Sequence, residues 1–140
     1  MGIDAMENSE MWLATAQAAL EKGIGATALY CAEMAVEIAL KGVLLELRVD
    51  IPKSHNIVPL ARACMDENRK KLPKEFNERL EFVLGTLSEL LDLRPLAGYA
   101  FERNVDEGEL GEKAKDYVKR AEEAIRLCGI AAAHIAKKNG

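Results

Sequence analysis

The sequence predicts an all-α protein, an up-and-down bundle of four long helices and one short helix. In each long segment, apolar residues recur at the three- and four-residue spacing of a helix, and no segment shows the alternation typical of a strand. The most apolar segment is 28–47, where Glu33, Glu37 and Lys41 lie four residues apart. A helix this apolar belongs in the middle of a bundle, and its charges form one line along its edge.

Glycines, prolines and capping residues give the expected ends of each helix. Gly23 ends the first helix, Pro52 ends the second and Pro95 ends the fourth, because glycine and proline interrupt helices. The expected helices run from about 4–8 to 22, from 26 to 48, from 56 to 67, from 73 to 95 and from 109 to 137. The following residues are expected to share one core: Ala32, Ala35, Val36, Ala39, Leu40, Val43, Leu84, Leu87, Val118, Ala121 and Ile125.

A chain of 140 residues is expected to form one domain, 1–140, large enough to bury a core without disulfides. Its net charge of -4 argues against strong non-specific binding of nucleic acid, although it leaves room for a local basic patch. Charges interrupt the most apolar segment, and the N-terminus is acidic. We therefore expect neither a membrane span nor a secretory signal, and a cytoplasmic location.

The three cysteines, Cys31, Cys64 and Cys128, are far apart in the sequence and fall on apolar faces of expected helices. No pair of them has the short spacing of a zinc site. We interpret them as reduced, buried thiols that pack as small apolar groups. The sequence predicts no metal site and no cofactor.

Three stretches of the chain resemble the motifs of a known family. Trp12-Leu13-x-x-Ala16 is similar to an opening helix, and the segment 32–44, AEMAVEIALKGVL, resembles A-x-Q-A-x-E-x-x-L-K-A-x-L. Pro52-x-x-His55 with the two residues after it resembles P-x-x-H-D-L. These are motifs of the HEPN family (higher eukaryotes and prokaryotes nucleotide-binding domain), in its small prokaryotic stand-alone form. The resemblance is detailed up to Leu60 and only architectural beyond it.

The resemblance implies a helical bundle that forms a homodimer and has one of two roles. Many small members are encoded beside a minimal nucleotidyltransferase and act as its partner, often as a toxin–antitoxin pair. Others are metal-independent ribonucleases that carry Arg-x(4–6)-His ahead of the last long helix. The resemblance therefore implies a nucleotidyltransferase partner, a nucleotide or RNA ligand, or both.

The ribonuclease motif is incomplete in this chain. Arg94 is followed after four residues by Tyr99, where the motif has histidine, and Arg103 has no histidine within reach. Tyrosine, with a pKa of about 10, is a poor proton acceptor at neutral pH. Arg48 and His55 match the spacing, but the resemblance assigns His55 to a different motif. The sequence favours a non-catalytic partner, and a ribonuclease with Arg94-x4-Tyr99 in place of the motif stays the alternative.

Two groups of residues are candidates for a site. The ligand-binding candidates are Glu33, Glu37, Lys41 and His55. The catalytic candidates of the alternative are Arg94, Tyr99 and Arg103, in the least regular segment of the chain, where function often resides.

Each group also has a purely structural interpretation. Charges like those on the second helix more often form a solvated or ion-paired edge than a binding line, and His55 could serve only its local backbone. We predict that Arg94 or Arg103 lies within ion-pair distance of Glu33 or Glu37, which would join the two groups in one cleft.

Overall fold

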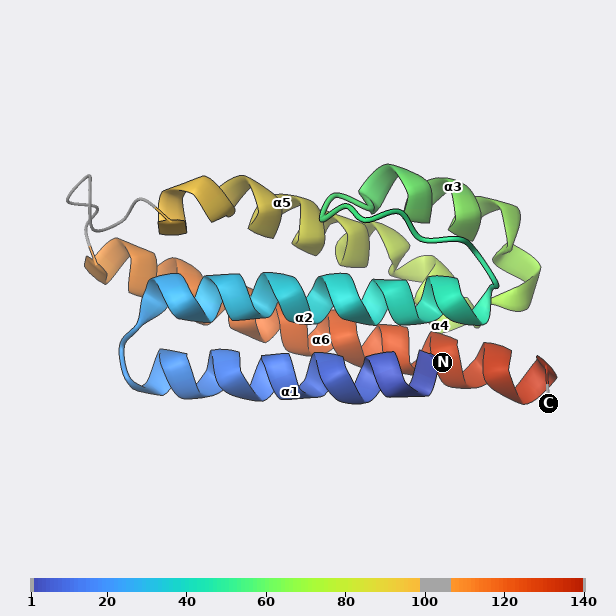
Figure 1. Cartoon of the computed structure of the whole chain (residues 1–140), viewed down its shortest axis with the longest axis horizontal. Helices are drawn as coiled ribbons and strands as arrows, with labels where there is room; N and C mark the ends of the chain where they lie inside the picture. Colours follow the sequence, from blue (N-terminus) through green and yellow to red (C-terminus); the bar gives the residue numbers. More distant parts are fainter. Residues whose placement is uncertain (1, 99–106, 140) are drawn as a thin grey trace.

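The computed structural model describes residues 2–98 and 107–139, and these residues form helices and turns without a strand. The predicted all-α class is confirmed, with four long helices and short ones between the second and third long helix. The elements are α1 (Gly2–Glu21), α2 (Gly25–Glu46), α3 (Val58–Glu67), the 3-10 helix η1 (Arg69–Lys71), α4 (Lys74–Glu78), α5 (Leu80–Gly98) and α6 (Glu107–Asn139) (Figure 1).

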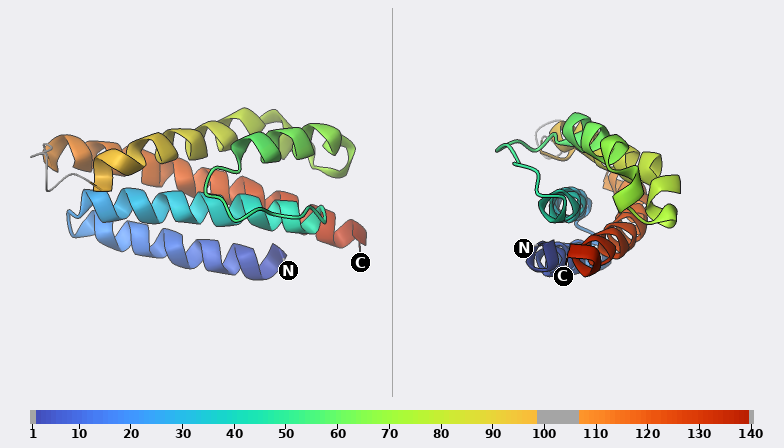
Figure 2. Two further views of the ribbon diagram at one scale, coloured as in Figure 1. Left: turned by 45° about the horizontal axis from the view of Figure 1, so that its top comes forward. Right: turned by 90° about the vertical axis from the view of Figure 1, so that its right-hand side faces the viewer.

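The helix α2 is the centre of the bundle, as its apolar composition predicts. It contacts α1, α5 and α6, which curve around it in the end-on view (Figure 2). The long helices alternate in direction along the chain (Figure 1). Every residue predicted for the core is buried: Ala32, Ala35, Val36, Ala39, Leu40, Val43, Leu84, Leu87, Val118, Ala121 and Ile125.

Small residues let α1 approach α2 closely. A Cβ atom added to Gly42 of α2 would lie 3.1 Å from the Cβ of Ala5 on α1 and 3.3 Å from the backbone oxygen of Gly2. Both are tight contacts for side-chain carbon. The backbones of the two helices can therefore lie this close only because residue 42 has no side chain.

Two helix ends differ from the sequence prediction. The helix α2 ends at Glu46, before Pro52, because Arg48 adopts a left-handed conformation with a φ of 62°. Such a residue ends many helices, and the Val49 amide accordingly bonds back to the carbonyl of Leu44. The prediction that Pro95 ends the fourth helix was wrong, since α5 continues to Gly98. A proline this close to the end of a helix removes only one backbone bond of the last turn.

The helix predicted to begin at Pro73 is two helices, α4 and α5, separated at Arg79. The side-chain amide of Asn77 donates hydrogen bonds to the carbonyls of Arg69 and Leu72. These bonds tie α4 to the turn before it. Periodicity alone could not detect this break, since Phe76 and Leu80 on its two sides are both buried at helical spacing.

The three cysteines are free, as predicted. Cys31 and Cys128 are buried, whereas Cys64 is only half-buried, so the prediction of three buried thiols was correct for two of them. No helix within the described ranges has the length and apolar character needed to cross a bilayer.

Candidate functional site

The two carboxylates of the charged line on α2 lie inside the protein and not on a solvated edge. The side chain of Glu33 is 1% exposed and that of Glu37 is 2% exposed. They lie one helical turn apart and therefore on the same face of α2. Carboxylates this deeply buried need charged or hydrogen-bonding partners, and α5 and the loop after α2 supply them.

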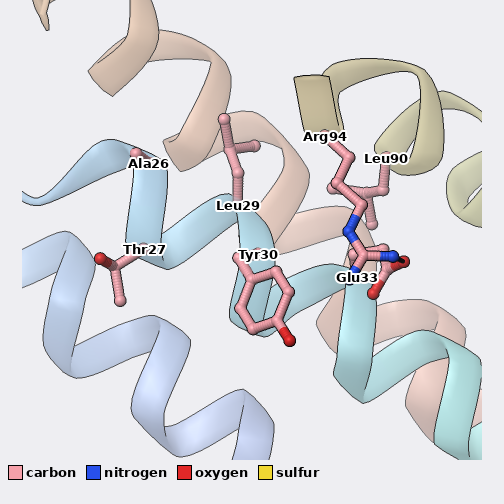
Figure 3. A pocket seen from close by; sticks show the side chains of 7 residues that line it. All are labelled: Ala26, Thr27, Leu29, Tyr30, Glu33, Leu90 and Arg94. Carbon is pink, nitrogen blue, oxygen red and sulfur yellow. Dashed lines mark hydrogen bonds and ion pairs between the residues drawn. The ribbon is translucent and has the colours of Figure 1, made fainter. Parts of the chain in front are cut away.

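Arg94, near the end of α5, reaches across to Glu33 (Figure 3). Its Nη1 lies 3.5 Å from Oε1 of Glu33, so the predicted contact between this arginine and the charged line is present. The second oxygen, Oε2, is buried and has no hydrogen-bond partner among the described residues. Burial raises the pKa of Glu33, as does the nearby charge of Glu37, while Arg94 and the other cationic groups partly oppose the shift.

Glu37 is held from two sides. Lys41, one turn further along α2, places its Nζ 2.9 Å from Oε2 of Glu37. The Nδ1 atom of His55 lies 2.9 Å from Oε1 of the same carboxylate. When Nδ1 carries the proton it donates to Glu37, which leaves Nε2 as the basic nitrogen.

The loop after α2 places His55 beside Glu37. The left-handed residue at the end of α2 turns the chain, and the loop then runs back along the helix (Figure 2). Two side chains hold the loop near the histidine. The backbone N–H of Asn56 donates to Oγ of Ser54, and the backbone N–H of Val58 donates to Oδ1 of Asn56. The ring of His55 is 53% exposed, so it contacts both the buried carboxylate and solvent.

Glu33, Glu37 and His55 also offer a set of donors for a metal ion. One atom of each lies within 4.8 Å of the others. A cation at this point would have to displace Lys41 from Glu37, with which it pairs at 2.9 Å. We therefore interpret the group as a network of ion pairs, and name it the α2 charge cluster: Glu33, Glu37, Lys41, His55 and Arg94.

A pocket opens at one end of this cluster. It encloses about 400 Å³, within the usual range for sites of small ligands. Glu33 and Arg94 are its charged residues, and apolar side chains from α2 and α5 form most of the rest (Figure 3). Its lining consists of Ala26, Thr27, Leu29, Tyr30, Glu33, Leu90 and Arg94.

Tyr30 is the residue of this pocket that the sequence did not single out. The residue is 40% exposed, the guanidinium of Arg94 lies 5.3 Å from its ring centroid, and its ring forms a T-shaped pair with that of Trp12. The available signal was its spacing, since an aromatic residue three positions before Glu33 lies beside it on a helix. Trp12, which the sequence placed in the first motif of the resemblance, packs here against Tyr30.

The structure thus brings members of the two predicted groups together. Arg94 and His55 lie on the same cluster, each bound to a carboxylate of α2. Tyr99 and Arg103 lie outside the described residues. A catalytic role of Arg94-x4-Tyr99, and an ion pair of Arg103 with Glu33 or Glu37, therefore stay predictions.

Comparison with known proteins supplies the family. A family model for the HEPN domain matches residues 4–131, nearly the whole chain. No curated protein and no solved structure gives a significant match. The family model supports a helical module of the nucleotide-binding or ribonuclease-like kind, in agreement with the helical bundle observed. The chain belongs to the HEPN domain family.

Proposed function

We propose that this protein is a non-catalytic HEPN module that binds a nucleotide in the pocket beside Tyr30. One observation carries the proposal. An exposed aromatic ring and an arginine meet at the mouth of a mostly apolar pocket, next to a buried carboxylate. Few other classes of small ligand combine a flat ring, an anion and polar edge groups, whereas every nucleotide does.

Each part of the pocket suits a part of a nucleotide. The face of Tyr30 offers a platform on which a base can stack, and base–aromatic stacking contributes about 1–3 kcal/mol. Arg94 presents a fork of N–H donors that matches the oxygens of a phosphate. Leu29 and Leu90 supply apolar walls that exclude water from the base.

Calorimetric titration with nucleoside monophosphates tests this function. We expect binding that Tyr30→Ala and Arg94→Ala each weaken by about tenfold or more, because each removes one recognition element. Arg120→Ala is the matched control, since Arg120 also lies over a tyrosine, Tyr117, but on α6 and outside the pocket lining. Absence of binding by the wild-type protein, or equal losses in all three variants, would contradict the proposal.

We further propose that the module acts as the partner of a minimal nucleotidyltransferase, in the manner of a toxin–antitoxin pair. The support is family membership together with the incomplete ribonuclease motif in the sequence. The first test is whether the neighbouring reading frame encodes a small nucleotidyltransferase, as we expect. Size-exclusion chromatography of the two proteins mixed should then give one co-eluting complex. Separate elution at micromolar concentrations would count against this partner.

The ribonuclease alternative rests on a different observation. A histidine bound through Nδ1 to a buried carboxylate is arranged as a general base, and Arg94 lies on the same cluster to meet a phosphate. His55 would then replace the histidine that the motif lacks. RNA cleavage without added metal, lost in both His55→Gln and Arg94→Ala, would establish this alternative and overturn the non-catalytic proposal.

A further inference from the structure

We infer that the pocket selects guanine among the bases, with Glu33 reading the edge of the ring. This inference rests on the proposed nucleotide-binding function and names the class of nucleotide. It comes from one unusual atom, the buried Oε2 of Glu33, which has no hydrogen-bond partner among the described residues. Buried acceptors are nearly always satisfied, so an unsatisfied one in a pocket wall indicates where a ligand donor is to bind.

The carboxylate of Glu33 is available for a ligand because its contact with Arg94 is loose. The separation of 3.5 Å exceeds that of a good charge-assisted hydrogen bond, which is about 2.7–2.9 Å. The side chain of Arg94 is 33% exposed, so we expect it to rotate toward solvent when a ligand binds. Once it has moved, both oxygens of Glu33 can accept, and the arginine is free to bind a phosphate.

Two adjacent acceptors on one carboxylate suit guanine and no other common base. Guanine presents two neighbouring donors, N1–H and the amino group on C2, that can bind both oxygens of a carboxylate. Adenine and cytosine present one amino group beside a ring nitrogen that is itself an acceptor and would repel the second oxygen. Uracil presents a single N–H between two carbonyls. If only one donor binds the carboxylate, its other oxygen stays buried without a hydrogen bond, and this costs binding free energy.

The position of Glu33 relative to Tyr30 supports this assignment. The two residues are three positions apart on α2, so the carboxylate lies about one helical turn along from the ring. A base stacked on Tyr30 would therefore point an edge along the helix toward Glu33. Figure 3 shows the side chains of Tyr30 and Glu33 on α2, with the guanidinium of Arg94 beside the carboxylate.

A ligand series on the wild-type protein tests the inference without any substitution. Guanosine, inosine and adenosine monophosphates share sugar and phosphate, and inosine lacks only the amino group on C2. We expect the dissociation constant to rise by about tenfold or more from the guanine to the inosine nucleotide, since one bond to a charged acceptor is lost. The adenine nucleotide is expected to bind more weakly than both.

The variant Glu33→Gln tests the same contact from the side of the protein. Its amide has one acceptor and one donor. The ratio of the dissociation constants for the inosine and guanine nucleotides should therefore fall to nearly one, while the adenine nucleotide still binds. Glu81→Gln is the control, a substitution of an exposed glutamate at the far end of α5 that contacts Arg62. Circular dichroism of both variants checks that they are folded. If Glu33→Gln does not fold, the ligand series on the wild-type protein still tests the inference.

The outcomes separate the two proposals. Equal affinity for all three nucleotides, or a preference for adenine, would overturn the guanine assignment and leave nucleotide binding intact. Absence of binding for all three would overturn both. A guanine preference that survives in folded Glu33→Gln would assign the selectivity to another residue and overturn the role of Glu33.

Discussion

Glu33 is a carboxylate that the fold keeps in the protein interior at an electrostatic cost. Its partner Arg94 lies 3.5 Å away, and one of its oxygens is unsatisfied within the described residues. An ion pair that leaves part of a buried charge unsatisfied contributes little net stability. Such a residue is better explained by ligand binding than by folding.

Stability should therefore depend on the protonation of Glu33. Because its pKa is raised in the folded protein above the ordinary value of 4.5, the folded state holds this proton more tightly than the unfolded chain. Stability from this group is fully present below pH 4.5 and is lost as the pH rises through the folded-state pKa.

Thermal unfolding of the wild-type protein and Glu33→Gln over a pH series measures this effect. The variant cannot ionise, so its melting temperature should rise relative to that of the wild type as the pH increases above 4.5. A difference in melting temperature that is independent of pH would show that Glu33 has an unshifted pKa. Exposed Glu81→Gln should show no comparable trend.

At the level of residues, the sequence predicted which side chains meet in the charge cluster, but it did not predict how deeply the carboxylates are buried. The four-residue spacing of Glu33, Glu37 and Lys41 placed them on one line, and a cation was expected to meet it. Their burial could not be predicted, because it depends on α5 and on the loop after α2 lying over that line. Tyr30 was missed because its exposure also depends on those neighbours.

Among the elements, α2 organises the bundle, and its contact with α1 depends on residues without side chains. A Cβ added to Gly42 would lie close to α1, whereas for Gly111 on α6 no described neighbouring atom outside the local helix backbone lies within 4 Å of an added Cβ. The two glycines lie within helices, where alanine is favoured over glycine by about 0.5–1 kcal/mol. They therefore form a matched pair of sites.

We expect Gly111→Ala to increase the free energy of unfolding by about 0.5–1 kcal/mol. Gly42→Ala gains the same helix propensity, but its methyl group would lie 3.1 Å from the Cβ of Ala5, so α1 has to move. Chemical denaturation should show Gly42→Ala to be clearly less stable than Gly111→Ala. Equal stabilisation by both substitutions would show that the α1–α2 contact is not tight.

The helix boundaries illustrate a limit of reading elements from sequence. Periodicity located the long helices, because burial of one face imposes it. It did not locate their ends, since Arg48 rather than Pro52 ends α2, and Pro95 is accommodated within α5. Ends depend on local backbone geometry and on bonds such as those of Asn77, which leave no periodic signal in the sequence.

On the scale of the whole molecule, we predict a homodimer. The family resemblance motivates it, and large apolar side chains that lie on the surface of the described chain support it. Met11 is 70% exposed and Ile24 is 48% exposed. A twofold dimer brings the same surface of both protomers together, and exposed apolar side chains are stabilised when they are buried there.

Light scattering at micromolar concentration measures the dimer directly. We expect a species of twice the 15.4 kDa mass of the chain, which dissociates on dilution. Met11→Glu should shift the equilibrium toward the monomer, because a charge at an apolar interface is costly to desolvate. A wild-type protein that scatters only as the 15.4 kDa species would contradict the prediction.

Arg94, which contacts Glu33 where the pocket opens, is one side chain on a helix, and this bears on how quickly a ligand can enter. Rotamers of partly exposed side chains change in picoseconds to nanoseconds, whereas lids and domains open in microseconds or longer. We expect rotation of Arg94 about its own bonds, without movement of a helix, to expose the carboxylate. Ligand capture should therefore be limited by encounter, with a rate after rapid mixing that rises linearly with ligand concentration and reaches no plateau.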